Sequence, residues 1–169
     1  MKEITLRPIG VIRSPHQQPT GTPIQSAYAE GIQGEVILDE PYVAAPADLE
    51  RVERIWLLYF FDRARAWRPR VVPFLDDQER GLFSTRAPAR PNPIGLSVVR
   101  LMSVSGNTLK VDGIDVLDGT PLLDIKPYVP AFDAHPDSRA GWLDSSLPSG
   151  RELADTRFSG AESPHGGRR

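Results

Sequence analysis

The sequence predicts a mainly β protein of one domain, built as a barrel or sandwich of short strands. Apolar stretches of strand length recur along the 169 residues, and segments rich in the 14 glycines and 17 prolines separate them. This pattern favours strands joined by tight turns. Amphipathic helices longer than about a dozen residues and internal repeats are lacking. The length is that of one ordinary domain.

Most of the expected strands are short runs rich in β-branched and aromatic residues. They are expected at residues 4–14, 34–38, 55–61, 96–104 and 109–111. The run 55–61 is continuously apolar and flanked by charge, which predicts a strand buried on both faces at the centre of the core. The last two stretches predict a hairpin. Two further short strands are expected before Pro130.

The segments between the strands predict loops and one short helix. Residues 16–31 contain prolines and glycines and predict an ordered loop, long enough to carry a site. Pro46 followed by residues 47–52 predicts a short helix. We expect the folded domain to span residues 1–144 and a polar, disordered tail to span 145–169, because the tail has too little apolar area to order itself.

Several classes of protein are excluded or disfavoured by composition. No cysteine is present, which rules out disulfides, iron–sulfur clusters, zinc–thiolate sites and a cysteine nucleophile. His16, His135 and His165 are far apart in the sequence, so we expect no metal site. Charge near the start and the lack of a long apolar stretch predict a cytoplasmic protein with no membrane contact.

The positive charges are concentrated in the middle of the chain. The formal net charge is −2, which argues against an indiscriminate nucleic-acid binder, yet residues 51–100 hold ten arginines against five acids. That excess predicts a local anion-binding patch. Within it, the run 63–70 interleaves four arginines with Trp67, as expected where both a phosphate backbone and a base plane are contacted. The alternative is solvated loop charge.

The segment Arg90-Pro91-Asn92-Pro93 predicts a rigid corner. The two prolines restrict the backbone on both sides of Asn92 and lack amide hydrogens, so carbonyl oxygens stay available. Such a corner suits recognition of an exocyclic amine, because it accepts hydrogen bonds without donating a proton. The alternative is a tight structural turn.

The segment 118–128 combines carboxylates with Lys126 and Tyr128. Asp118 and Asp124 would share one face of a strand. If that face lines a pocket, a carboxylate could bind ribose hydroxyls or a cationic ligand, while Lys126 and Tyr128 could contact a phosphate and a base. The alternative is a set of exposed charges at a strand end.

Taken together, five motifs resemble those of one family, the TsaA-like or TrmO tRNA methyltransferases. They are Gly-Val-Ile-Arg-Ser-Pro at 10–15, the aromatic run after a Trp at 56–61, Arg-Pro-Asn-Pro-Ile-Gly at 90–95, Asp-Gly-Thr-Pro at 118–121 and Asp-Ile-Lys-Pro-Tyr at 124–128. The resemblance covers about residues 9–133 and is closest to a short form without the C-terminal extension of longer bacterial members.

The resemblance implies a single-sheeted β-barrel with short helices and long ordered loops that binds S-adenosyl-L-methionine. It further implies a homodimer with composite sites and methylation of N6 of threonylcarbamoyladenosine next to the tRNA anticodon. The lack of any Gly-x-Gly agrees with a cofactor site other than the dinucleotide type. The chain departs from the family at Ile24, where many members have Arg, and at Asp62, where many have His.

Candidate site residues follow from these motifs and the resemblance. We expect Asn92 to orient the acceptor amine and Tyr128 to stack on the base, as the catalytic pair. The expected cofactor-binding residues are Gln25, Phe60, Phe61, Asp62, Arg86, Leu96, Asp118, Gly119, Thr120 and Pro121. The expected RNA-binding residues are Arg13, Arg63, Arg65, Arg68, Arg90 and Lys126.

Other functions are compatible with the same residues. The barrel and cofactor could serve another nucleoside or a small molecule as acceptor. A non-catalytic RNA-binding β-barrel would need only the arginine run and the tail, with Asn92 as a structural residue. A third possibility is a small-ligand-binding barrel without an RNA partner.

Overall fold

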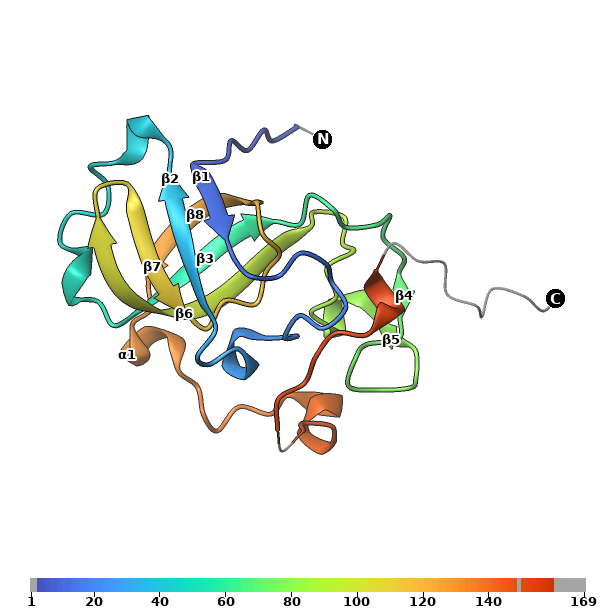
Figure 1. The fold of residues 1–169 in the computed structure, drawn as a ribbon. Helices are drawn as coiled ribbons and strands as arrows, with labels where there is room; N and C mark the ends of the chain where they lie inside the picture. The colour runs from blue at the N-terminus through green and yellow to red at the C-terminus, as the bar shows by residue number, and fades with distance from the viewer. Residues whose placement is uncertain (1–2, 149, 160–169) are drawn as a thin grey trace.

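A closed barrel of six strands forms the centre of the protein (Figure 1), in a computed structural model that describes residues 3–148 and 150–159. The strands are β1 (Gly10–Arg13), β2 (Gln33–Leu38), β3 (Arg54–Phe60), β6 (Ile94–Ser105), β7 (Thr108–Asp112) and β8 (Thr120–Pro127). They follow the order β1-β2-β7-β6-β3-β8, and every neighbouring pair is antiparallel. The prediction of a mainly β, single-sheeted barrel is confirmed.

The remaining elements are short. A two-stranded ribbon pairs β4 (Arg70–Val71) with β5 (Arg80–Gly81), and α1 is a single turn at Pro130–Asp133. Turns of 3₁₀ helix lie at Ser26–Tyr28, Glu40–Tyr42, Leu49–Arg51, Leu82–Ser84, Gly141–Ser145 and Thr156–Phe158. The helix expected at 47–52 is only the 3₁₀ turn Leu49–Arg51, because Asp48 has a left-handed φ of 67° that a helix cannot continue through.

The core fills the inside of the barrel. Its fully buried side chains come from alternate positions of the strands and from the segment after β7: Ile12, Val36, Ile55, Leu57, Val99, Leu109, Val111, Ile114 and Leu122. β3 pairs with both β6 and β8, as every strand of a closed barrel pairs with two neighbours. The prediction that this strand is buried on both faces is wrong. Ile55, Leu57 and Tyr59 are buried, whereas Phe60 on the outer face is 38% exposed. A single-layer barrel covers only one face of each strand.

Two other strand predictions differ from the structure. The first strand is limited to Gly10–Arg13, because Pro8 cannot donate to a ladder, and Ile4 and Leu6 are exposed. Between the hairpin and Pro130 there is one strand, β8, rather than two. Its eight residues pair with β1 at one end and with β3 along most of their length.

The long loops gather beyond one end of the barrel, together with the β4–β5 ribbon and the C-terminal segment (Figure 1). Residues 152–154, which lie in the predicted tail 145–169, pair with residues 21–24. Gly21 N donates to Ala154 O at 2.8 Å, Ala154 N donates to Thr22 O at 2.7 Å, and Pro23 and Leu153 form an antiparallel bridge. Residues 149 and 160–169 of the predicted tail lie outside the described residues.

Candidate functional site

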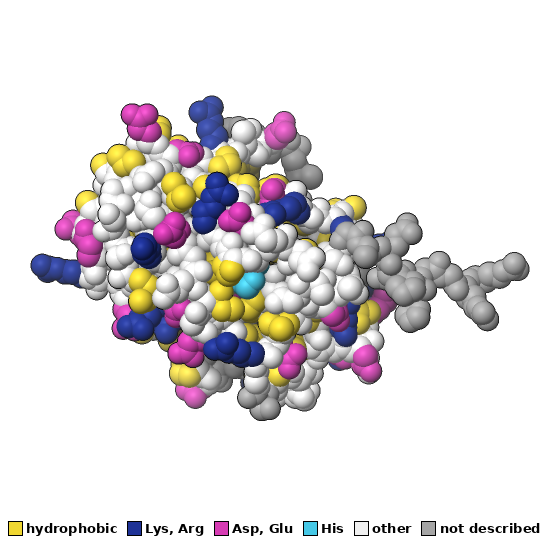
Figure 2. All heavy atoms as spheres, viewed as in Figure 1, with side chains coloured by type: hydrophobic (Ala, Val, Ile, Leu, Met, Phe, Trp, Pro, Cys, Tyr) yellow, Lys and Arg dark blue, Asp and Glu magenta, His cyan; other side chains and the backbone are white. Residues whose placement is uncertain are grey.

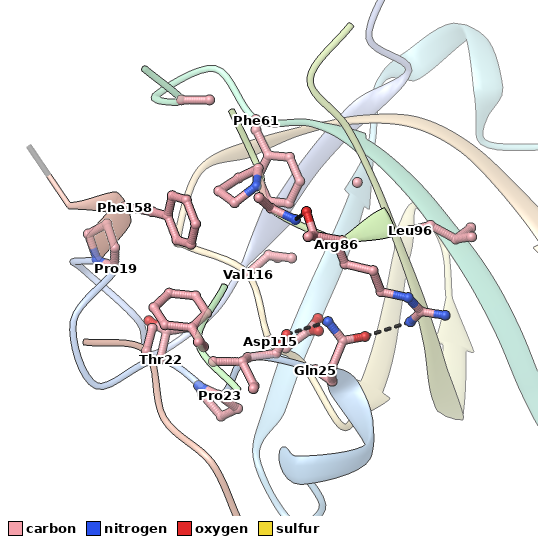
Figure 3. Close-up of a pocket in the computed structure, with 18 of the residues that line it drawn as sticks. Pro19, Thr22, Pro23, Gln25, Phe61, Arg86, Leu96, Asp115, Val116 and Phe158 are labelled. Carbon is pink, nitrogen blue, oxygen red and sulfur yellow. Dashed lines mark hydrogen bonds between the residues drawn. The ribbon is translucent and has the colours of Figure 1, made fainter. Parts of the chain in front are cut away.

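A pocket of about 600 Å³ opens at the barrel end where the long loops gather (Figure 3). This end brings together the last residues of β3 and the first residues of β6 and β8, because β3 is antiparallel to both. Loop residues 19–28, 85–90 and 115–117 and the C-terminal segment complete the walls. Phe61 and Phe158 face the cavity from different sides in Figure 3. Its size is typical of sites for small organic ligands.

A chain of three polar side chains runs from the barrel interior to this pocket. Ser97 Oγ donates to Asp115 Oδ1 at 2.6 Å, and Tyr59 Oη lies 2.9 Å from Ser97 Oγ. A hydroxyl has one hydrogen, so Ser97 must accept the hydrogen of Tyr59. Tyr59 and Ser97 are both buried, and each hydroxyl has a hydrogen-bond partner within the chain.

Gly95 makes room for Tyr59. The two residues are partners across β3 and β6, and a Cβ at Gly95 would lie 2.0 Å from the Tyr59 ring. Any side chain at position 95 would therefore displace the ring and, with it, the hydroxyl that bonds Ser97. Gly95, the last residue of the Arg-Pro-Asn-Pro-Ile-Gly motif, is therefore needed for the packing of Tyr59.

The electrostatics of the pocket are unusual at the same residues. Burial raises the pKa of Asp115 to about 6, although the Ser97 hydroxyl, nearby backbone amides and the charge of Arg86 oppose the rise. Burial also raises the pKa of Tyr59 well above its usual range. Perturbed groups that line a cavity mark a candidate functional site.

A second polar pair lines the pocket. Arg86 Nη1 donates to Gln25 Oε1 at 2.6 Å, and the Gln25 amide nitrogen donates to Ile24 O at 2.5 Å (Figure 3). These two bonds fix the orientation of the Gln25 amide. Gln25 accepts from one nitrogen of Arg86, so other N–H groups of the Arg86 guanidinium can donate to a ligand. With Asp115, the cavity presents a carboxylate, a guanidinium and aromatic rings to one ligand.

The structure brings eight of the predicted site residues to the pocket. Six of them were expected to bind the cofactor: Gln25, Phe61, Asp62, Arg86, Leu96 and Thr120. The other two, Arg63 and Arg90, were expected to bind RNA. Phe60 is not in the lining, because it alternates with Tyr59 along β3 and points to the outer face.

Asp118 and its neighbours brace the loops beside the pocket. The Asp118 carboxylate accepts a hydrogen bond from Ser14 N at 3.1 Å and lies 3.4 Å from Arg13 Nη1. The backbone carbonyl of Asp118 accepts a hydrogen bond from Arg63 Nη2 at 2.9 Å, and the same nitrogen lies 3.3 Å from Thr120 Oγ1. Gly119 and Pro121 belong to the same turn and strand start, and Asp118, Gly119 and Pro121 do not line the cavity.

Asn92 lies in the turn just before β6, where it is exposed. The carbonyls of this corner are engaged by the backbone: Asn92 O accepts from Ile94 N and Pro93 O accepts from Phe61 N, both at 2.8 Å. Ile94 lines the pocket, so Asn92 is near its rim without being part of its wall. The corner expected from the prolines is present, but its acceptors are partly used.

Tyr128 is at the other end of the barrel. Its amide donates to Arg54 O, and its ring packs against Trp56 with centroids 5.8 Å apart. Arg54 begins β3, whereas the pocket lies at the end of that strand, so one chain does not bring Tyr128 to the pocket. Lys126 is paired with Trp56 in the ladder and forms an ion pair with Asp124 at 2.8 Å, also away from the pocket.

The remaining predicted cations lie on loops. Arg65 and Arg68 are exposed in the segment between β3 and β4. Arg90 Nη1 donates to Thr85 O at 2.9 Å, and its guanidinium lies 5.6 Å from the Phe83 ring centre. Figure 2 shows positive and negative side chains interspersed on the face seen there, so that face forms no continuous cationic surface.

Sequence reasoning missed Tyr59, Ser97, Asp115 and the C-terminal wall. A signal for Asp115 exists: it is an acid between Ile114 and Val116, two apolar residues that are both buried. Tyr59 offered a weaker signal, a hydroxyl within an otherwise apolar strand that needs a buried partner. The C-terminal wall, which includes Trp142, Ala154 and Phe158, gave little local signal, because its apolar residues occur singly or in pairs among polar ones.

Within residues 3–148 and 150–159, no group of three or more His, Asp or Glu side chains is arranged to hold a metal ion. In that part of the chain, no helix has both the length and the apolar character that crossing a bilayer requires.

Comparisons with known proteins agree with the motifs. Residues 11–134 match the family model for the tRNA-methyltransferase O N-terminal domain. A probable S-adenosyl-L-methionine-binding protein of Pyrococcus abyssi is 47% identical over 144 residues, which is 85% of this chain and 78% of that protein. The tRNA (adenine(37)-N6)-methyltransferase of Escherichia coli is 37% identical over 156 residues, which is 86% of this chain and 66% of that protein.

A solved structure is also similar. The crystal structure of TrmO from Pseudomonas aeruginosa has a TM-score of 0.71 at 41% identity, over 83% of this chain and 63% of that one. The chain therefore spans about two thirds of the length of these bacterial relatives. The match to the family model includes β1 to β8 and covers most of the chain, so this protein belongs to the tRNA-methyltransferase O N-terminal domain family, as its motifs predicted.

Proposed function

We propose that the protein is an S-adenosyl-L-methionine-dependent methyltransferase that acts on N6 of an adenosine in tRNA. The observation that carries the proposal is the pocket: Asp115 and Tyr59, which Ser97 links by hydrogen bonds, and an Arg86–Gln25 pair line one cavity at the end of a family barrel. Relatives named for S-adenosyl-L-methionine binding and for tRNA (adenine(37)-N6) methylation support the cofactor and the reaction.

The residues of the pocket fit the cofactor. Its amino-acid end has a carboxylate, which suits Arg86 and Gln25 because a guanidinium and an amide donate to such a group. Its cationic and hydroxyl groups suit Asp115, and its ring and sulfonium suit the aromatic face of Phe61. When bound, S-adenosyl-L-methionine supplies an electrophilic methyl group. The protein then has to hold the acceptor nitrogen in line with it, which is worth up to roughly 7–11 kcal/mol.

We propose Asn92 as the residue that orients the acceptor nitrogen from the pocket rim. The prolines on both sides restrict its backbone, so its amide is presented in a defined direction. Asn92→Ala is expected to lower kcat far more than affinity for the cofactor. Equal losses in both would contradict this role.

We propose a homodimer with composite sites. Phe60 (38%), Ile94 (40%) and Leu96 (50%) are exposed apolar side chains on neighbouring positions of β3 and β6, and Phe60 is the ladder partner of Ile94. Leu96 also lines the pocket. A second copy that covers this stripe would border the pocket and could supply the Tyr128 that one chain holds at the far end of its barrel.

We propose N6-threonylcarbamoyladenosine as the acceptor, next to the anticodon, and a cytoplasmic location, where tRNA is modified. The threonyl group carries a carboxylate of its own, and Arg63, Arg86 and Arg90 all line the pocket. One guanidinium can serve the cofactor carboxylate and another the threonyl carboxylate. The same charges make up for Ile24, which cannot contact an anion.

A second candidate keeps the cofactor and replaces tRNA with a small-molecule acceptor. It is favoured by the C-terminal segment, which closes one side of the cavity with Trp142, Ala154 and Phe158. An acceptor in tRNA has to reach a pocket partly covered by this wall, whereas a small molecule does not.

One set of assays separates these functions. The purified protein is incubated with labelled S-adenosyl-L-methionine and tRNA from cells that lack the gene, and the nucleosides are analysed. Transfer to threonylcarbamoyladenosine is the expected result, and transfer to another nucleoside would overturn the acceptor alone. Failure of S-adenosylhomocysteine to raise the melting temperature would overturn the cofactor and thus the methyltransferase.

A further inference from the structure

A second groove lies beside the pocket and is not used by the proposed chemistry. It has a volume of about 370 Å³ and is lined by Trp67, Pro69, Gly81, Leu82, Phe83, Ser84 and Pro91. Two of these residues expose large aromatic surfaces: Phe83 is 80% exposed and Trp67 is 51% exposed. We propose that this aromatic groove binds an unstacked base of the substrate RNA, a nucleotide other than the one that is methylated. The proposal rests on the proposed tRNA methylation.

The groove is held in place by hydrogen bonds between its two sides. Leu82 N donates to Pro69 O at 2.9 Å, next to the β4–β5 ribbon, and the Leu82 side chain is buried. Arg70 Nη2 donates to Glu79 O at 3.0 Å and closes the ribbon from the other side. These bonds hold the two backbone segments that carry Trp67 and Phe83 beside each other before any ligand binds, which reduces the entropy lost on binding.

Charge favours a nucleic acid as the occupant. The segment from residue 63 to 70 contains four arginines. Arg63 and Arg70 form ion pairs with Asp62 and Glu79, Arg65 and Arg68 are exposed, and Arg90 lies over Phe83. Aromatic rings bordered by arginines are typical of sites for single-stranded nucleic acids, because rings stack on bases while guanidinium groups contact phosphates. A symmetric contact with a second copy through this groove would place the same arginines against each other.

The groove and the pocket share one loop. Phe83 and Ser84 line the groove, whereas Thr85 and Arg86 line the pocket. Ser84 O accepts a hydrogen bond from Trp142 Nε1, which belongs to the pocket wall, at 2.9 Å. A base in the groove and an acceptor base in the pocket would therefore be close neighbours along an RNA loop. Stacking of single-stranded loop bases on aromatic side chains is the common mode of RNA recognition.

The test uses the full chain and a synthetic anticodon stem-loop, with one loop nucleotide at a time made abasic. Trp67→Ala and Phe83→Ala are each expected to weaken binding of the intact stem-loop by about 5- to 150-fold, with affinity for S-adenosylhomocysteine unchanged. Trp67→Phe and Phe83→Tyr keep an aromatic face and should retain binding. Phe132→Ala is the control, because Phe132 is 75% exposed on α1, away from the groove.

One abasic position should weaken the wild type as much as Trp67→Ala does, and should have no further effect in that variant. If removing a base weakens binding by the same factor in the wild type and in both Ala variants, at every loop position, the inference is overturned. So would a change in oligomeric state in the Ala variants, which would assign the groove to a second copy. If the wild type methylates the stem-loop and the variants bind it normally, the inference alone fails, whereas no binding by the wild type removes the proposed function as well.

Discussion

Asp115→Asn should stabilise the protein at neutral pH. The raised pKa means that the folded state binds the Asp115 proton more tightly than the unfolded state. The rise from its ordinary value of 3.8 to about 6 has burial as its main cause. The free energy of unfolding of the wild type therefore falls as the pH rises from about 4 to about 6. At 1.36 kcal/mol for each tenfold change in the acid constant, the loss is about 3 kcal/mol.

Asparagine removes this dependence on pH without removing the packing. It has nearly the same shape, and its carbonyl oxygen can still accept the Ser97 hydrogen. The stability gained by the variant over the wild type should therefore grow between pH 4 and pH 6 and be level above about pH 7. Affinity for S-adenosylhomocysteine should fall by roughly 10-fold or more, because a hydrogen bond to a charged group is lost.

Urea unfolding followed by tryptophan fluorescence across pH 4 to 8 measures this difference. Asp137→Asn is the matched control for the loss of one negative charge, since Asp137 is exposed and outside the pocket lining. Parallel stability curves for the wild type and Asp115→Asn would refute the reasoning. A variant that loses stability at every pH would show that the carboxylate is a structural group.

Three other substitutions test the packing of Tyr59, the contact of Arg157 with residues 73–76, and the proposed dimer. Gly95→Ala should lower the free energy of unfolding by about 1–3 kcal/mol, because its Cβ would lie 2.0 Å from the Tyr59 ring; a Tyr59→Leu background should reduce this cost, and full additivity would contradict the contact. Arg157→Ala should make residues 73–76 more sensitive to proteolysis, since Arg157 Nη1 donates to Pro73 O and Asp76 O; unchanged cleavage would argue against this tether. Leu96→Glu should convert the proposed dimer to a monomer in sedimentation experiments, and a wild type that is already monomeric would end that proposal.

Much of the barrel could be predicted from the sequence because its strands are local patterns. The apolar run ending in Phe60 and Phe61 and the hairpin before Asp112 are apparent from residue type alone, and the structure has both as β3, β6 and β7. The wrong prediction for Phe60 has a nonlocal cause. The burial of Phe60 depends on whether a second layer covers the sheet, and the sequence does not encode that locally.

The site was less predictable than the fold, for a physical reason. Gln25 and Arg86 are separated by 61 positions, and their 2.6 Å contact exists only because two long loops meet over the barrel end. Ser97 and Asp115 are 18 positions apart and meet just beyond the last β6–β7 pair, Arg100 with Asp112. Motif arguments could identify turns such as Asp118–Pro121. They could not tell whether the Asp118 carboxylate faces the cavity or, as the structure has it, Ser14 and Arg13.

Two parts of the pocket wall differ in how firmly backbone hydrogen bonds hold them. The residues from β3, β6 and the segment before β8 are fixed by a closed ladder without an edge. The C-terminal wall lies beyond the matched range 11–134 and pairs with residues 21–24 through three backbone hydrogen bonds, between 2.7 and 3.2 Å. A short paired segment opens at a lower free energy than a closed barrel. Amides of this pair, such as Ala154, should therefore exchange with deuterium before those of β3, such as Leu57. Opening of this pair would uncover the side of the pocket that Ala154 and Phe158 close, and would give the proposed tRNA acceptor a route into it.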